Sequence, residues 1–191
     1  MKALIVVDVQ NDFCPNGSLA VNEGDKIIPF VNQLLPKYEV VVFTKDNHPE
    51  RMEAFASFHE GKNPFEKYIN SKGQEDVLWP DHCVKGTYGN ELHKDLKFDE
   101  KSHKLFLKGE EVYDHPYSGF GAKGLDIYLR DKKVTDVDVV GLAFDYCVKE
   151  TAIDSSKLGF KTTVLMEGTR GISEDNDPTI KELTENSVFI K

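Results

Sequence analysis

The part of the sequence that decides the fold reads Gly141-Leu142-Ala143-Phe144-Asp145-Tyr146-Cys147-Val148. It follows an apolar run over residues 137–140 and precedes a helical pattern that ends at Gly159. A strand, a tight turn and a helix are therefore predicted to meet at Cys147. Because a helix N-terminus stabilises an anion, we expect a lowered pKa and a reactive thiolate at Cys147. A buried structural cysteine is the alternative interpretation.

Similar apolar runs lie on both sides of this stretch and predict strands over 3–7, 39–44, 104–107, 137–141, 162–166 and 187–190. Helical patterns lie between them, after Asp25, over 125–129, over 147–158 and from Asp177, which we expect to cap a helix with Pro178 in its first position. Strands that alternate with helices, and a first strand apolar enough for burial on both faces, predict a parallel sheet. The expected fold is a three-layer α/β/α sandwich with a mainly parallel, Rossmann-like sheet of about six strands.

Length and composition indicate one α/β domain over 1–191, with a long loop insertion at about 45–90. The net charge of −9, without any run of basic residues, argues against nucleic acid or an anionic membrane as a partner. No apolar segment approaches the length of a membrane span. Three widely spaced cysteines without a CxxC pair, and an apolar start too short for a signal peptide, predict a reduced, cytoplasmic protein. The sequence leaves open whether it forms homo-oligomers.

Polar side chains follow several of the predicted strands. Asp8 follows the first strand, Lys108 the third, and Cys147 the fourth. Parallel sheets bind ligands beyond the carboxyl ends of their strands, where a carboxylate and an ammonium group would serve a nucleophilic thiol. The alternative is that Asp8 caps a loop and Lys108 is solvated. Phosphate-binding motifs (GxGxxG, the P-loop) and the GxSxG motif are absent, which argues against nucleotide-dependent and serine-hydrolase functions.

A second polar group follows the second strand. Asp46 and His48 lie two residues apart and would project to the same side of an extended segment, and His82 lies in the same long loop. Imidazole and carboxylate groups together suit zinc, manganese or iron, although ordinary surface positions are the alternative. Further candidate ligands in the loop are Glu50, Glu53 and His59. The remaining histidines, His93, His103 and His115, are expected to be surface residues.

Five sequence blocks occur in order along the chain: Asp8-Val9-Gln10-Asn11-Asp12-Phe13, Asp46-Asn47-His48-Pro49, Trp79-Pro80-Asp81-His82-Cys83, Lys108-Gly109, and the stretch 141–148. Together they resemble the nicotinamidases, which belong to the isochorismatase-like cysteine hydrolases. The Asp, Lys and Cys blocks are typical of the superfamily. The Asp-x-His and Trp-Pro-x-His-Cys blocks are typical of its metal-containing nicotinamidase branch.

The resemblance implies a catalytic triad of Asp8, Lys108 and Cys147. It implies one divalent metal ion, zinc in the first place with manganese or iron as alternatives, bound by Asp46 and two histidines, His48 and His82. Departures from the family pattern, such as Met52 near the place of a further family histidine, leave the fourth ligand open between water, Glu50, Glu53 and His59.

The resemblance also implies a pocket for a small-molecule pyridine carboxamide, nicotinamide or pyrazinamide, lined by Phe13, Trp79, Tyr117 and Leu142. The Leu142–Ala143 peptide would be cis, and the backbone N–H groups of Ala143 and Cys147 would form an oxyanion hole. The implied reaction converts nicotinamide and water to nicotinate and ammonia through a thioester, as a step of NAD salvage.

Three other functions remain as alternatives at this point. The first is another amidohydrolase of this fold, acting on an N-carbamoyl or ureide substrate. The second is a non-catalytic binding protein on the same scaffold. The third is a redox-sensing thiol protein, although no resolving cysteine lies near Cys147 in the sequence.

Overall fold

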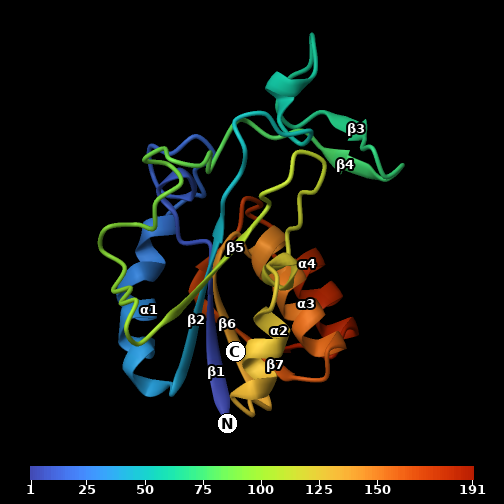
Figure 1. The fold of residues 1–191 in the computed structure, drawn as a ribbon. Helices are drawn as coiled ribbons and strands as arrows, with labels where there is room; N and C mark the ends of the chain where they lie inside the picture. Colours follow the sequence, from blue (N-terminus) through green and yellow to red (C-terminus); the bar gives the residue numbers. More distant parts are fainter.

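A six-stranded parallel sheet forms the centre of the protein, which a computed structural model describes over residues 1–191 (Figure 1). Its strands are β1 (Lys2–Val7), β2 (Val40–Asp46), β5 (Lys104–Lys108), β6 (Asp136–Leu142), β7 (Lys161–Arg170) and β8 (Phe189–Ile190). They pair in the order β5-β2-β1-β6-β7-β8, and every pair is parallel. The predicted mainly parallel sheet of about six strands is confirmed. The order reverses between β1 and β6, which is where sheets of this kind bind their ligands.

Helices cover both faces of the sheet (Figure 1). Helix α1 (Ile28–Leu34) packs on one face, and α2 (Leu125–Asp131), α3 (Lys149–Lys157) and α4 (Asp177–Glu185) pack on the other. Side chains alternate along β1, so that Leu4 and Val6 join the cluster on the α1 side, while Ile5 joins the cluster on the opposite side. Both faces are apolar because both are covered.

Three helices begin elsewhere than predicted. The helix expected directly after Asp25 is preceded by a 3-10 turn over Gly24–Ile27, and α1 begins only at Ile28. A π-helical turn occupies Phe144–Val148, so the regular helix α3 begins only at Lys149. Helix α4 begins at Asp177 and its N-cap is Asn176, so the predicted N-cap at Asp177 is wrong by one residue. Pro178 still falls in the first turn, where its missing N–H costs nothing. None of the helices is both long and apolar enough to cross a membrane.

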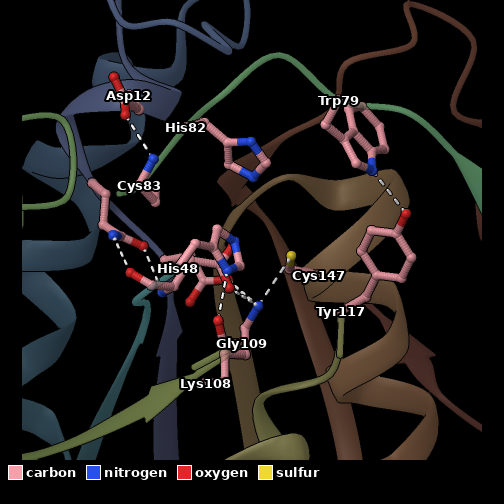
Figure 2. Close-up of polar contacts among 12 residues, drawn as sticks. Asp12, His48, Trp79, His82, Cys83, Lys108, Gly109, Tyr117 and Cys147 are labelled. Carbon is pink, nitrogen blue, oxygen red and sulfur yellow. Dashed lines mark hydrogen bonds and ion pairs between the residues drawn. The ribbon is translucent and has the colours of Figure 1, made fainter. Parts of the chain in front are cut away.

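The long segment between β2 and β5 contains a hairpin that the sequence did not predict. Its antiparallel strands are β3 (Lys67–Ile69) and β4 (Glu75–Val77). The hairpin lies beyond the carboxyl ends of the central strands (Figure 1). Isolated bridges fasten this segment to itself, Phe55 with Trp79 and His48 with Val84. The segment thereby brings Trp79 and His82 over the edge of the sheet (Figure 2).

Candidate active site

The carboxyl ends of four neighbouring strands carry the candidate catalytic residues. Asp8 follows β1, Asp46 ends β2, Lys108 ends β5, and Cys147 lies in the π-helical turn after β6. Because these strands are parallel and adjacent, their ends meet at one edge of the sheet. Figure 2 shows Lys108 and Cys147 pointing toward each other there.

The Lys108 ammonium group lies at the centre of this arrangement. Its Nζ is 3.0 Å from Oδ2 of Asp8, 2.5 Å from Oδ1 of Asp46 and 3.5 Å from Sγ of Cys147. The Oδ1 atom of Asp8 accepts a hydrogen bond of 2.6 Å from the Thr44 hydroxyl. All four charged or reactive side chains are buried. The three residues proposed from the sequence as a triad therefore lie together.

The electrostatics differ from the expectation of a low cysteine pKa. Burial, supported by Asp8 and Asp46, raises the pKa of Cys147 well above its usual value, although Lys108 acts in the opposite direction. Burial also raises the pKa of Asp8 against the lowering effect of Lys108. For Lys108, burial lowers the pKa, but Asp46 and Asp8 outweigh it and raise the value. The resting nucleophile is thus a thiol, and Asp8 is a stronger base than an ordinary carboxylate.

Two buried amide side chains hold the backbone of Asp46 in place. Gln10 accepts a hydrogen bond from the Asp46 N–H and donates one to the Asp46 carbonyl, both at 2.8 Å. Asn90 donates to the same carbonyl at 2.7 Å and to the Cys83 carbonyl at 2.9 Å. Asp12 accepts a hydrogen bond from the Cys83 N–H at 2.7 Å (Figure 2). These positioning residues were missed, because their partners come from segments far away in the sequence.

Three histidines form a cluster beside Asp46. The ligand atoms of His48, His82 and His115 all lie within 4.8 Å of one another. The Nδ1 atoms of His48 and His82 face the carbonyls of Gly109 and Pro80 at 2.9 and 2.8 Å, so their Nε2 atoms stay available for a metal ion. The Nε2 atom of His48 is buried, lies 3.4 Å from Oδ2 of Asp46 and has no hydrogen-bond partner.

The cluster fits a divalent transition metal. Burial, reinforced by His48, lowers the pKa of His82 to about 4 and that of His115 well below its usual value. For Asp46, burial opposes ionisation, but Lys108 and His48 outweigh it and hold the pKa well below its usual value. Neutral imidazoles together with an ionised carboxylate are the ligand set that zinc and its neighbours prefer.

Gly109 makes room for the His48 ring. A Cβ atom at this position would lie 2.4 Å from Cε1 and 2.6 Å from Nδ1 of His48, and the backbone has φ +68°. Only glycine adopts this conformation freely and leaves the space open. The Lys108-Gly109 block thus supplies the ammonium group of Lys108, and Gly109 provides both the carbonyl that binds His48 and the space for its ring.

Several expectations about the metal ligands are corrected. His115 is not a surface residue, because the fold brings it into the histidine cluster. Glu50, Glu53 and His59 do not belong to that cluster. The carboxylate of Glu53 instead binds Ser71, and the ring of His59 binds the Glu53 carbonyl at 2.7 Å.

A narrow cavity of about 20 Å³ opens beside Cys147. Its wall includes three of the residues predicted for the substrate pocket, Phe13, Trp79 and Tyr117, together with Tyr146. The Trp79 indole donates a 2.9 Å hydrogen bond to the Tyr117 hydroxyl, which donates to Asp76 of β4 at 2.8 Å.

Of the two residues Leu142 and Ala143, which were both predicted to belong to the site, only Ala143 lies at the cavity. Leu142 does not line the cavity: as the last residue of β6 it points into the core on the α1 side and is fully buried. Ala143 does lie on the cavity wall. The Leu142–Ala143 peptide is cis, as the family resemblance implied. The Ala143 N–H donates no hydrogen bond within the protein.

Known proteins resemble this chain over most of its length. The model of the isochorismatase domain matches residues 2–187. The chain is 42% identical to the nicotinamidase of Acinetobacter baylyi over 176 residues, which cover 89% of this chain and 81% of that protein. It superposes with a TM-score of 0.93 on the yeast nicotinamidase bound to the inhibitor nicotinaldehyde, which is 36% identical, and the match covers 100% of this chain and 99% of that chain. It superposes with a TM-score of 0.84 on the Pyrococcus horikoshii pyrazinamidase in complex with zinc, which is also 36% identical, and that match covers 100% of this chain and 98% of that chain. The chain therefore belongs to the isochorismatase family, as its sequence blocks predicted.

Proposed function

We propose that this protein is a cysteine amidohydrolase that converts nicotinamide and water to nicotinate and ammonia. The observation that carries the proposal is the contact between Lys108 and both Cys147 and Asp8, at 3.5 and 3.0 Å, beside a cavity with aromatic walls. A thiol nucleophile with an adjacent base, and a cation that stabilises its thiolate, can carry out covalent amide hydrolysis. Relatives named as nicotinamidases and a pyrazinamidase support the substrate class, and we extend the proposal to pyrazinamide.

In the first half of the reaction, Asp8 accepts the proton of the Cys147 thiol and the sulfur attacks the carboxamide carbon. A C–S bond forms, and the carbonyl oxygen becomes an oxyanion. The free N–H of Ala143 is the donor on the cavity wall that would stabilise this oxyanion. When the C–N bond breaks, Asp8 returns its proton to the leaving nitrogen, and ammonia departs from a thioester.

In the second half, Asp8 removes a proton from water, whose oxygen attacks the thioester carbon. The C–S bond breaks, Asp8 passes the proton it took from water to the sulfur, and the nicotinic acid loses its carboxyl proton to solvent and leaves as nicotinate. Throughout the cycle Lys108 remains an ammonium group, because Asp46 and Asp8 raise its pKa. Its charge stabilises the transient thiolate, which the burial of Cys147 otherwise disfavours.

We propose Asp46, His48 and His82 as ligands of one divalent metal ion, with zinc as the first candidate. A zinc complex of the related Pyrococcus horikoshii protein and the unpartnered Nε2 of His48 support this assignment. When bound, the ion would supply a Lewis acid that orients the pyridine ring nitrogen. Phe13 and Trp79 would hold the ring by its faces and edges.

The test is ammonia release from nicotinamide by the purified protein, beside Cys147→Ala and a matched control, Cys14→Ala. Cys14 is also a buried free cysteine, but it does not line the cavity. We expect activity in the wild type and in Cys14→Ala only. Activity that survives in Cys147→Ala would rule out the covalent route.

A second measurement separates nicotinamide hydrolysis from the rival amidohydrolase functions. N-carbamoyl and ureide compounds are offered to the same protein, and its metal content is determined. We expect about one metal ion per chain and little turnover of those compounds. Efficient turnover of a carbamoyl substrate without bound metal would contradict the proposal.

A further inference from the structure

His115 is the residue of the cavity whose chemistry the proposed reaction leaves unused. It lies in the segment between β5 and α2, 33 residues beyond His82 in the sequence. Its ring centroid is 5.2 Å from that of His48, 6.2 Å from that of His82 and 4.8 Å from that of Tyr117. The residue lines the same cavity as Cys147.

The ring nitrogens of the cluster fall into two groups. The Nδ1 atoms of His48 and His82 are occupied by the carbonyls of Gly109 and Pro80. In contrast, Nδ1 of His115 is buried and has no hydrogen-bond partner, and the same is true of Nε2 of His48. Buried polar atoms without partners are rare in folded proteins, and two of them in one cluster indicate a missing ligand.

The charges around the cluster point to a cation. Asp46 places Oδ2 3.4 Å from Nε2 of His48, while its other oxygen binds Lys108. All three histidines offer a ligand atom within 4.8 Å of the others, so one ion can contact all of them. Imidazole nitrogen outnumbers carboxylate oxygen in this set, which favours zinc and late transition metals over magnesium or calcium.

We propose that His115 is a direct ligand of the metal ion and supplies the fourth protein ligand, beside Asp46, His48 and His82. The inference deepens the proposed function, because it concerns the metal site of the same cavity. It assigns to His115 the place for which the sequence offered only Glu50, Glu53, His59 or water. The segment that follows Lys108 thereby contributes Tyr117 to the cavity beside Cys147 and His115 to the metal site.

Metal affinity is the first readout, measured on metal-free protein by competition with a chromophoric zinc chelator. The variants are His115→Ala, His48→Ala and, as the matched control, His93→Ala, which removes a histidine outside the cluster. Loss of an outer-shell partner typically weakens metal binding by about 10–100-fold. We expect His115→Ala and His48→Ala each to weaken zinc binding by more than about 100-fold, with no change for His93→Ala. Wild-type affinity in a folded His115→Ala variant would overturn the proposal.

The second readout needs no variant. X-ray absorption of the zinc-loaded wild-type protein counts imidazole ligands, and we expect three, whereas two would overturn the assignment of His115. The ammonia assay is independent of both readouts. If zinc binds with three imidazoles but no nicotinamide is hydrolysed, the proposed function fails and the ligand assignment stands; if ammonia is released with two imidazoles, the reverse holds.

Discussion

The ammonium group of Lys108 lies 2.5 Å from one oxygen of the Asp46 carboxylate. The other oxygen of Asp46 lies 3.4 Å from Nε2 of His48, so the Asp46 side chain connects the group of Lys108, Asp8 and Cys147 to the histidine cluster. Lys108 also contacts Asp8 at 3.0 Å. One buried cation therefore compensates two buried carboxylates, and the charge balance of both sites depends on it.

Replacing Lys108 by Met should destabilise the protein strongly. Removing one partner of a buried ion pair leaves an uncompensated charge, which typically costs about 3–5 kcal/mol. Urea denaturation at pH 7 measures the loss. Lys67→Met is the control, since Lys67 pairs with Glu75 on the exposed hairpin and its removal should change little. Equal unfolding free energies for the two variants would show that the two buried carboxylates do not depend on Lys108.

The raised pKa of Cys147 predicts how its alkylation depends on pH. Because burial keeps the thiol protonated, the thiolate fraction in the metal-free protein should rise about tenfold per pH unit through pH 9. The rate of iodoacetamide labelling, followed by peptide mass spectrometry to separate Cys147 from Cys14 and Cys83, should rise in parallel. A rate that levels off near pH 7 would instead support the helix N-terminus as the dominant influence.

Tyr117→Phe should weaken substrate binding while leaving the chemical step nearly intact. The change keeps the ring but removes the hydroxyl that joins Trp79 to Asp76. Both hydrogen bonds exist before substrate binds and are worth about 0.5–1.5 kcal/mol each, so losing the order they give to Trp79 should raise KM for nicotinamide by at most roughly 150-fold. Steady-state kinetics separates KM from kcat. A fall in kcat at constant KM would mean that Tyr117 acts on the transition state.

The sequence predicts features that depend on neighbouring residues better than features that depend on contacts between residues far apart in the chain. The apolar runs predicted all six central strands. For β1, β2, β6 and β7 the reason is burial on both faces, which leaves a continuous apolar pattern, whereas the edge strands β5 and β8 are partly exposed and show shorter apolar runs. The hairpin β3–β4 was not predicted, because strands of three residues are too short to show an alternation of apolar and polar side chains. The predicted N-cap at Asp177 was wrong by one residue: Asn176 takes the N-cap position without a side-chain capping hydrogen bond, and local sequence signals do not fix a helix end to the residue.

The site divides in the same way. Asp8, Lys108 and Cys147 could be placed together because each lies at or just beyond the carboxyl end of a strand of one parallel sheet. The side of the strand on which Leu142 points, and the partners of His115, depend on packing between distant segments. The pKa of Cys147 was predicted in the wrong direction because a local argument about a helix end does not include Asp8, Asp46 and the burial that the fold provides. Sequence blocks thus indicate the chemistry, and tertiary contacts set its energetics.

Gly109→Ala should reduce metal affinity through His48. The new Cβ would lie 2.4 Å from the ring, so the imidazole must move away from the cluster. Gly61→Ala is a matched control, because Gly61 also has positive φ, +74°, but a Cβ added there would meet no atom within 4 Å. Both variants should lose about 1–2 kcal/mol of stability from the left-handed backbone. Only Gly109→Ala should also bind zinc more weakly in chelator competition; equal affinities would show that the ring has room to adjust.

The metal-free protein should lose stability as the pH falls from about 6.5 to 4. Burial lowers the pKa of His82 from 6.5 to about 4, so between these values the unfolded chain binds a proton that the folded chain does not. Stability therefore rises with pH across this window, by about 3 kcal/mol for this residue. Urea denaturation of the metal-free wild type and of His82→Ala at several pH values isolates the share of His82 together with its effect on the neighbouring His115. The unfolding free energies of the two proteins should converge toward pH 4, because only the wild type has the imidazole of His82 to protonate. If the difference between them stays constant with pH, the pKa of His82 is not lowered in the folded protein.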